Sequence, residues 1–281
     1  MKPEIRYGKA EIRLYRTHAR PLPGVRSNTL FGAEVRVDVY GDNFLAAYTE
    51  GDNTEVVATD TIKNFTYAMA LEFTGATPEG FAAFLARRFL EAYPQMQRVA
   101  VRVRELPFAE HSEKLLSPLA GDHGLVEVDA DRSGVQRLEA GRGDLRLVKL
   151  TGSSFAHFAR DRYTTLPERA DRPLFIHLDL GWRYRDPEDG LSEDLQRYVP
   201  SEHVAQLVLD TFDQFVSLSI QHLVHEMGQR ILARWAQLDQ VRLEAQNRLW
   251  DTSAVSETDP RVKVYSDPKP AYGLISLTLK R

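Results

Sequence analysis

The amino-acid sequence predicts an α+β fold in which antiparallel sheets carry pairs of helices on one face. Runs of alternating polar and apolar residues, joined by short turns, are typical of antiparallel strands with one solvent-facing side. Two pairs of amphipathic helices interrupt these runs, so that strands, a helix pair and further strands follow one another twice. We therefore expect two tandem repeats of about equal length, at residues 1–120 and 121–281.

The first repeat is expected to begin with strands and to continue with a helix pair. Gly41-Asp42-Asn43 supplies turn chemistry between two expected strands. A helix is expected from Thr59 to about Gly75, and another from Thr77 to Pro94, with residues 108–124 irregular. The expected strands are Glu11–Arg16, Phe31–Tyr40, Phe44–Thr49 and Gln97–Arg104.

The segment Val56–Asn64 predicts a strand that runs directly into a helix. Thr59, Asp60 and Thr61 are all favourable N-cap residues, so we expect one of their side chains to accept a backbone N–H. A helix start also has unpaired N–H groups and the positive end of the dipole, which together suit an anionic ligand. Capping alone is the simpler interpretation of this segment in isolation.

The second repeat is expected to follow the same plan. One helix is predicted to be capped by Ser201-Glu202, and another covers Ile220–Trp235. The sheet of one repeat leaves its edge strands unpaired. Closure into a larger barrel by several chains would remove those edges. The expected strands are Gly134–Leu138, Leu145–Leu150, Leu174–Trp182, Val241–Ala245 and Leu274–Leu279.

Composition narrows the class of protein. The 281 residues are 43% hydrophobic and 27% charged, with no apolar run long enough to cross a bilayer, so no membrane partner is expected. A net charge of −4 gives no reason to expect nucleic acid. The chain starts without a secretion signal and ends in Leu279-Lys280-Arg281, which is no peroxisomal signal, so a cytoplasmic location is expected.

Few chemical motifs stand out in the sequence. The absence of cysteine excludes disulfides, thiolate nucleophiles and cysteine-ligated metals. His222 and His225 share a helix face, but their spacing fits neither order of the zincin motif, so we expect no metal site there. Arg142-Gly143-Asp144 is interpreted as a turn. No phosphate-binding loop, serine elbow or paired-carboxylate motif is present.

A set of short segments is informative because of its order along the chain. These segments are Arg6–Lys9, Val57–Asn64, Gly152–Phe155, Arg160–Leu166, Asp171-Arg172, Ser219–Gln221, Gln229–Arg234 and Gln246-Asn247. Together they resemble the urate oxidase (uricase) family, and they span nearly the whole chain. The resemblance implies two tunnelling-fold (T-fold) repeats and four chains in a tunnel-like barrel. It also implies sites between chains and no metal or cofactor.

The resemblance implies specific roles in urate binding. Urate is flat, polar and anionic, so its site needs a planar face, a bidentate donor and an amide. Phe155 would stack on the purine, Arg172 would make paired charge-assisted hydrogen bonds, and Gln221 would clamp another edge. The backbones of Ile220 and Asp60 would add contacts.

The implied reaction is the oxidation of urate by O2 and water to 5-hydroxyisourate and hydrogen peroxide. We hypothesise that Lys9 activates Thr59 as a proton relay. A lysine can accept that proton only when desolvation lowers its pKa from about 10.4. Asn247, together with Thr59, would hold O2 or the attacking water.

The sequence departs from the family pattern at one point. The family relay has a histidine just after the asparagine, and this chain has Arg248 or Leu249 there. Arginine cannot act as a neutral proton acceptor. Either Lys9 and Thr59 work with water, or Arg248 orients a water, or the enzyme is weaker. A T-fold relative that binds urate or a pterin, with weak or different activity, therefore stays open as an alternative.

Overall fold

The computed structural model describes residues 4–27, 29–267 and 270–281. Its centre is one eight-stranded sheet in the order β1-β2-β3-β6-β7-β8-β9-β12, in which every neighbouring pair is antiparallel. The predicted α+β class is therefore confirmed. The strands are β1 (Arg6–Arg16), β2 (Phe31–Tyr40), β3 (Arg98–Glu105), β6 (His123–Asp131), β7 (Gly134–Lys149), β8 (Leu174–Tyr184), β9 (Leu238–Asn247) and β12 (Gly273–Lys280).

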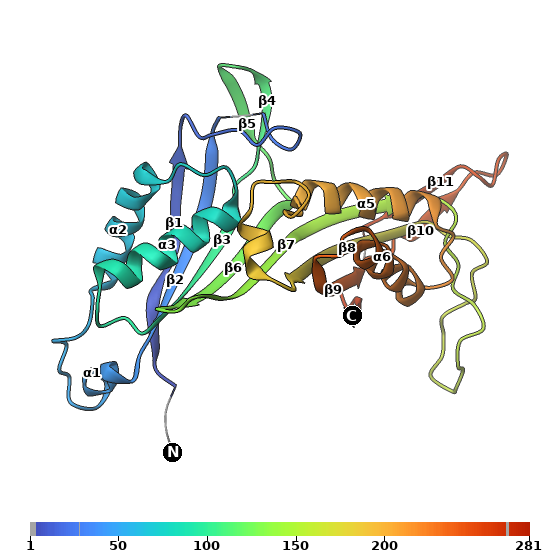
Figure 1. Cartoon of the computed structure of the whole chain (residues 1–281). Helices are drawn as coiled ribbons and strands as arrows, with labels where there is room; N and C mark the ends of the chain where they lie inside the picture. The colour runs from blue at the N-terminus through green and yellow to red at the C-terminus, as the bar shows by residue number, and fades with distance from the viewer. Residues whose placement is uncertain (1–3, 28, 268–269) are drawn as a thin grey trace.

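Two pairs of helices cover one face of this sheet (Figure 1). In the first half α2 packs on β1 and α3 on β3 and β6, and in the second half α5 packs on β7 and α6 on β9 and β12. In the described residues the other face carries no helix, which explains the alternating burial along β8. The helical segments are η1 (Asp42–Phe44), α1 (Leu45–Thr49), α2 (Thr59–Glu72), α3 (Pro78–Ala92), α4 (Pro187–Leu191), α5 (Ser201–Gln214) and α6 (Ile220–Arg234).

The strand expected at Phe44–Thr49 is wrong, because this segment is helical. It forms the end of η1 and the whole of α1. Phe44 is fully buried and packs edge-on against Tyr7, with the ring centroids 5.0 Å apart. The Thr49 hydroxyl donates to the Leu45 carbonyl over 3.1 Å, as expected within a helix. Six residues are too few to distinguish a strand from one helical turn by periodicity.

Residues 108–124 are not irregular as expected, because they hold a hairpin and the start of β6. The hairpin consists of β4 (Phe108–Ser112) and β5 (Leu115–Pro118) and lies apart from the main sheet (Figure 1). A second hairpin, β10 (Asp251–Val255) with β11 (Lys263–Ser266), was also not predicted. Both hairpins are mostly exposed, so they lack the clear apolar alternation of a buried strand.

The two strands expected at Gly134–Leu138 and Leu145–Leu150 form one strand, β7. The register against β8 shifts between Arg142 and Leu145, and Asp144 has a φ of 58°. This β-bulge interrupts the alternation, which made one strand look like two. Arg142-Gly143-Asp144 is therefore a bulge inside a strand, and the turn expected there is wrong.

The two halves of the chain correspond element by element. α2 and α5 both have 14 residues, α3 and α6 both have 15, and the same number of positions separates Thr59 from Ser201 and Pro78 from Ile220. The bulge in β7 has a counterpart in β1, where the register shifts just after Lys9. β6 and β12 then correspond as the last strands of their halves.

Glu79 is a buried acid between the two halves. It is 2% exposed, and the Tyr198 hydroxyl donates to its carboxyl over 2.9 Å. Burial raises the pKa of Glu79 to about 8, although the Tyr198 hydrogen bond and the charge of Arg26 act in the opposite direction. This raised pKa favours the protonated carboxyl group in the folded protein at neutral pH.

We expect Glu79→Gln to reduce the pH dependence of stability. Between a pH of about 4.5 and about 8, the folded protein holds a proton that the unfolded chain has released, so stability decreases as pH rises. The glutamine variant should lose up to about 1.4 kcal/mol per pH unit of this slope. Urea unfolding across that range measures it, with exposed Glu50→Gln as the control. Equal slopes in wild type and Glu79→Gln would contradict the buried neutral acid.

Candidate active site

The first group of site residues lies where β1 meets the start of α2. Lys9 is the last paired residue before the β1 bulge, and Thr59 and Asp60 are the first two residues of α2. The Asp60 carboxylate accepts from Lys63 over 2.5 Å and from Asn64 over 3.0 Å. The Lys63 hydrogen bond is the main cause that lowers the pKa of Asp60, and the charge of Lys9 adds to it. Lys9 and Asp60 are therefore electrostatic neighbours.

The expectations about the start of α2 need two corrections. No strand precedes the helix, and the N-cap is Ala58, which makes no side-chain hydrogen bond. Thr59, Asp60 and Thr61 all lie inside the helix, so none of them caps it. Ser201-Glu202 likewise begins α5 from inside, after an N-cap at Pro200. Thr77 does cap α3 as predicted, because its hydroxyl accepts from the Gly80 N–H over 3.0 Å.

Tyr7 holds β1 against the residues before α2, and Gly8 brings β1 close to β2; no role was predicted for either residue. The Val57 N–H donates to the Tyr7 hydroxyl over 3.1 Å, which ties the residue two before Thr59 to the residue two before Lys9. A Cβ on Gly8 would lie 2.0 Å from the Val37 carbonyl oxygen. Only glycine permits this close approach of the two strands.

The second group of site residues lies on the loop before β8 and at the start of α6. The Arg172 N–H donates to the Ser153 carbonyl over 2.9 Å, and the Arg172 guanidinium carbon lies 5.7 Å from the centre of the Phe155 ring. The Ser154 N–H donates to the Ser217 carbonyl over 2.9 Å, which holds this loop against the chain that enters α6. Phe155 and Arg172 are thus brought together.

The start of α6 presents backbone donors beside this loop. Ser219 is the N-cap, and its hydroxyl accepts from the His222 N–H over 3.0 Å. Ile220 and Gln221 are the first two helical residues, so their N–H groups have no acceptor within the helix. The Gln221 side chain is exposed.

Two buried polar atoms in this second group have no hydrogen-bond partner. They are the Arg172 Nε and the Asn247 Oδ1. Burial is the main cause that lowers the pKa of Arg172, and the charge of Arg169 adds to it. Asn247 in β9 pairs with the buried residue Ile176 in β8. Ile176 lies four positions after Arg172 in the chain. Buried polar groups are normally paired, so these two atoms indicate a place for a polar ligand or water.

The Arg248 side chain does not lie beside Asn247, where the histidine of the family relay is expected. Its guanidinium donates to the Gln246 Oε1 over 3.0 and 2.6 Å and lies 3.6 Å from the centre of the Tyr272 ring. Neighbours along a strand point to opposite faces, so Arg248 shares the face of Gln246 and points away from Asn247. Leu249 packs against the core. A water oriented by Arg248 beside Asn247 of the same chain is therefore not supported.

One chain does not bring the two groups together. β1 carries Lys9 and forms one edge of the sheet, whereas Asn247 ends β9, next to the opposite edge strand β12. The loop before β8, the end of β9 and the start of α6 all lie in the second half of the molecule (Figure 1), and they carry Arg172, Asn247 and Gln221. Any site that uses both groups therefore needs a second chain.

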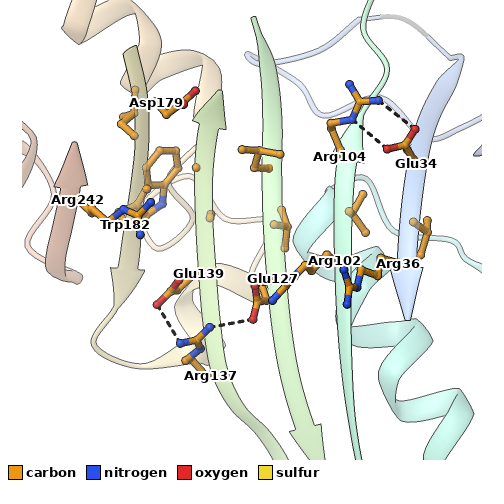
Figure 2. Close-up of a pocket in the computed structure, with 18 of the residues that line it drawn as sticks. Glu34, Arg36, Arg102, Arg104, Glu127, Arg137, Glu139, Asp179, Trp182 and Arg242 are labelled. Carbon is orange, nitrogen blue, oxygen red and sulfur yellow. Dashed lines mark hydrogen bonds and ion pairs between the residues drawn. The ribbon is translucent and has the colours of Figure 1, made fainter. Parts of the chain in front are cut away.

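A hollow of about 710 Å³ on the helix-free face contains none of the predicted site residues. Figure 2 shows arginines and carboxylates along its wall, with Arg104 paired to Glu34 and Arg137 paired to Glu127 and Glu139. Five arginines and five acidic residues line the hollow, so their charges balance. This charge balance does not favour an anionic ligand over a cationic one.

His222 and His225 do not form a metal centre with other residues. In the part of the chain that the structure describes, no group of three or more His, Cys, Asp or Glu side chains is arranged to hold a metal ion. The His222 ring packs edge-on against Phe215, with the centroids 4.7 Å apart. Within the same described ranges, no helix has the length and apolar character needed to cross a membrane.

Comparison with known proteins places this arrangement in a family. A family model described as uricase matches residues 5–132 and 138–276. A uricase of Haloferax volcanii is 41% identical over 309 residues, covering 99% of this chain and 98% of that protein. The structure of Bacillus sp. TB-90 urate oxidase superposes with a TM-score of 0.93 at 34% identity, covering 99% of both chains.

A further solved structure agrees with this match. The uricase from Bacillus fastidious superposes with a TM-score of 0.93 at 32% identity, covering 100% of this chain and 94% of that one. The antiparallel sheet with two helix pairs on one face defines a protein of the T-fold class. Within that class, the chain belongs to the uricase family.

We expect Gly8→Ala to destabilise the fold by about 1–3 kcal/mol, the usual cost of overpacking. The added methyl group meets the Val37 carbonyl oxygen at 2.0 Å, and neither backbone can move without breaking the pairing of β1 with β2. Gly181→Ala is the control, because its Cβ would meet the Ala140 carbonyl oxygen at an ordinary 3.6 Å. Thermal unfolding measures both, and equal midpoints would contradict the close approach.

Proposed function

We propose that this chain is a urate oxidase, which converts urate, O2 and water to 5-hydroxyisourate and hydrogen peroxide without a metal or cofactor. Membership of the uricase family supports the reaction. The observation that carries the site is the pair of buried, unpartnered atoms Arg172 Nε and Asn247 Oδ1. A planar anion with both donors and acceptors carries a partner for each of these two kinds of atom.

The substrate is proposed to lie on Phe155. The purine would stack on this ring while the Arg172 guanidinium makes paired hydrogen bonds to one edge. Gln221 would clamp another edge, and the backbone N–H of Ile220 would add a donor at the positive end of α6. The backbone of Asp60 would complete the contacts from the other group.

Proton transfer is assigned to the group on β1 and α2. Lys9 is proposed to activate the Thr59 hydroxyl, which would carry a proton to or from the purine. Thr59 and Asn247 would together hold O2 and later the attacking water. The electrostatic proximity of Lys9 to Asp60, the residue next to Thr59, supports this arrangement.

Assembly is part of the same proposal. The two groups of site residues lie toward opposite edges of one chain, so we propose sites between chains in a homotetramer that closes a barrel. The division into repeats at residues 1–120 and 121–281 also stays a proposal. The correspondence of β6 with β12 would move that boundary toward residue 132. A cytoplasmic location is proposed with it.

A second candidate is a T-fold protein that binds urate or a pterin with weak or different activity. The observation that favours it is the position of Arg248 and Leu249, which supply no neutral proton acceptor beside Asn247. One assay in buffer with a metal chelator separates the candidates. Loss of urate absorbance with equimolar peroxide supports the oxidase, metal dependence supports a different activity, and binding without consumption supports a binding protein.

We expect Arg172→Lys to weaken urate binding by a factor of about 10 or more. Lysine keeps the charge but loses the planar fork, so at least one charge-assisted hydrogen bond is lost. Calorimetry without O2 measures the affinity, with Arg242→Lys on the helix-free face as the control. Unchanged affinity in Arg172→Lys would remove Arg172 from the substrate site.

We expect Lys9→Met to lower turnover by a factor of about 100 or more while urate binding and the unfolding midpoint stay close to wild type. The variant removes the proton acceptor of the relay but keeps a side chain of similar length. Peroxide release measures turnover, and Lys114→Met in the exposed β4–β5 turn is the matched control. Turnover near the wild-type value would exclude the relay.

A further inference from the structure

A partly buried network of charged and polar side chains joins the two halves of the chain. The Arg26 guanidinium donates to Glu105 over 2.8 Å and to Glu202 over 2.9 Å, and its Nη2 is buried without a partner. Arg142 donates to the Ser201 hydroxyl over 3.1 Å. Arg26 and Glu105 belong to the first half, and the other three residues belong to the second.

Three members of this network correspond to Lys9, Thr59 and Asp60. Ser201 and Glu202 are the first two residues of α5, as Thr59 and Asp60 are of α2. Arg142 is the last paired residue before the β7 bulge, as Lys9 is before the β1 bulge. Two positions further along each strand, Glu11 and Asp144 have φ values of 56° and 58°. The place where Lys9 meets the start of α2 in the first repeat therefore has a counterpart in the second repeat. There, arginine and serine replace lysine and threonine.

Glu105, a member of this network, corresponds to Asn247, and Glu79, which interacts electrostatically with Arg26 and Glu105, corresponds to Gln221. Glu79 is the second residue of α3, as Gln221 is of α6, and each helix has a Thr or Ser N-cap whose hydroxyl accepts from the third residue. Glu105 lies opposite Ala33 in β2, and Asn247 lies opposite Ile176 in β8. Ala33 and Ile176 occupy equivalent positions relative to the bulges, because Ala33 pairs with β1 just after its bulge and Ile176 pairs with β7 just after its bulge.

The correspondence shows which groups meet at the junction. The counterparts of Gln221 and Asn247 come from the first repeat, and the counterparts of Lys9 and Thr59 come from the second. Here they meet inside one chain, because β6 pairs with β7. Glu105 also interacts electrostatically with both Arg142 and Glu202.

We propose that the junction is an internal copy of the urate site that its own side chains have closed, with the Arg26 guanidinium in the place of the ligand. Two carboxyl groups stand where the ligand site has two amides, and ionised Glu105 would repel an anion. Arg26 neutralises it and spans the gap from Glu105 to Glu202. The loop between β1 and β2 also has no Phe, Tyr or Trp to match Phe155.

The chemistry of Glu79 is consistent with its correspondence to Gln221. Its protonated carboxyl group presents one donor and one acceptor, as the Gln221 amide does, and it accepts from the Tyr198 hydroxyl. The consequence of closure is one urate per chain, although the fold contains two places of the same design. This inference depends on the proposed assignment of the site residues.

The test is the number of urate molecules bound per chain, measured by calorimetry without O2 so that no turnover occurs. Wild type should bind one. The variant Arg26→Ala/Glu79→Gln/Glu105→Asn restores both amides and removes the guanidinium, so it should bind a second urate at least about 10-fold more weakly, because no aromatic ring stacks on it. Adding Arg172→Lys to this variant should weaken the first binding event and leave the second.

The outcomes separate the two proposals. No binding to wild type would overturn the urate site and this inference together. Two molecules per wild-type chain, or one per chain in the folded triple variant, would overturn only the closed copy.

A second experiment applies if the triple variant does not fold. Arg26→Ala alone leaves a guanidinium-sized gap between Glu105 and Glu202, so guanidinium at about 10 mM should raise its melting temperature by mass action. The surface control Arg102→Ala also removes an arginine from a carboxylate, Glu127, and should not respond. Equal responses in the two variants would contradict a guanidinium-shaped place at the junction.

Discussion

The antiparallel pairing of β6 with β7 is the interaction on which the rest of the arrangement depends. It joins the last strand of one repeat to the first strand of the next, so that eight strands form one sheet with all major helices on one face. The same pairing leaves β1 and β12 as edges with unpaired backbone groups. Lys9 lies on one edge and Asn247 beside the other, which is why the proposed site needs more than one chain.

The junction and the proposed site have the same backbone arrangement but differ in the charge of their side chains. Both place a basic residue before a bulge and a hydroxyl residue at a helix start. The proposed site keeps Arg172 Nε and Asn247 Oδ1 without partners, whereas the junction fills the equivalent region with Arg26 and carboxyl groups. One backbone design can therefore hold a ligand in one place and stabilise the contact between repeats in the other.

Much of the fold was predictable because its core elements have strong periodicity. β8 alternates over its whole length, and α3 carries a clear apolar stripe that ends near Pro94. The predictions failed where the periodic signal was short, weak or interrupted. Phe44 lies in the core beside Tyr7, within a segment too short to show a clear period, and the bulge at Asp144 breaks the alternation of β7. Neither effect can be read from neighbouring residues alone.

The sequence by itself determined the periodicity of the main elements and the chemical types at the proposed site, because side-chain pattern and composition are local properties. The resemblance to the urate oxidase family also linked Phe155, Arg172, Gln221 and Asn247 to one substrate site. Only the tertiary structure decided which strands are neighbours, that Arg248 points away from Asn247, and that two buried polar atoms of the proposed site, Arg172 Nε and Asn247 Oδ1, lack partners. The physical reason is that pairing, burial and hydrogen-bond satisfaction depend on residues far apart in the chain.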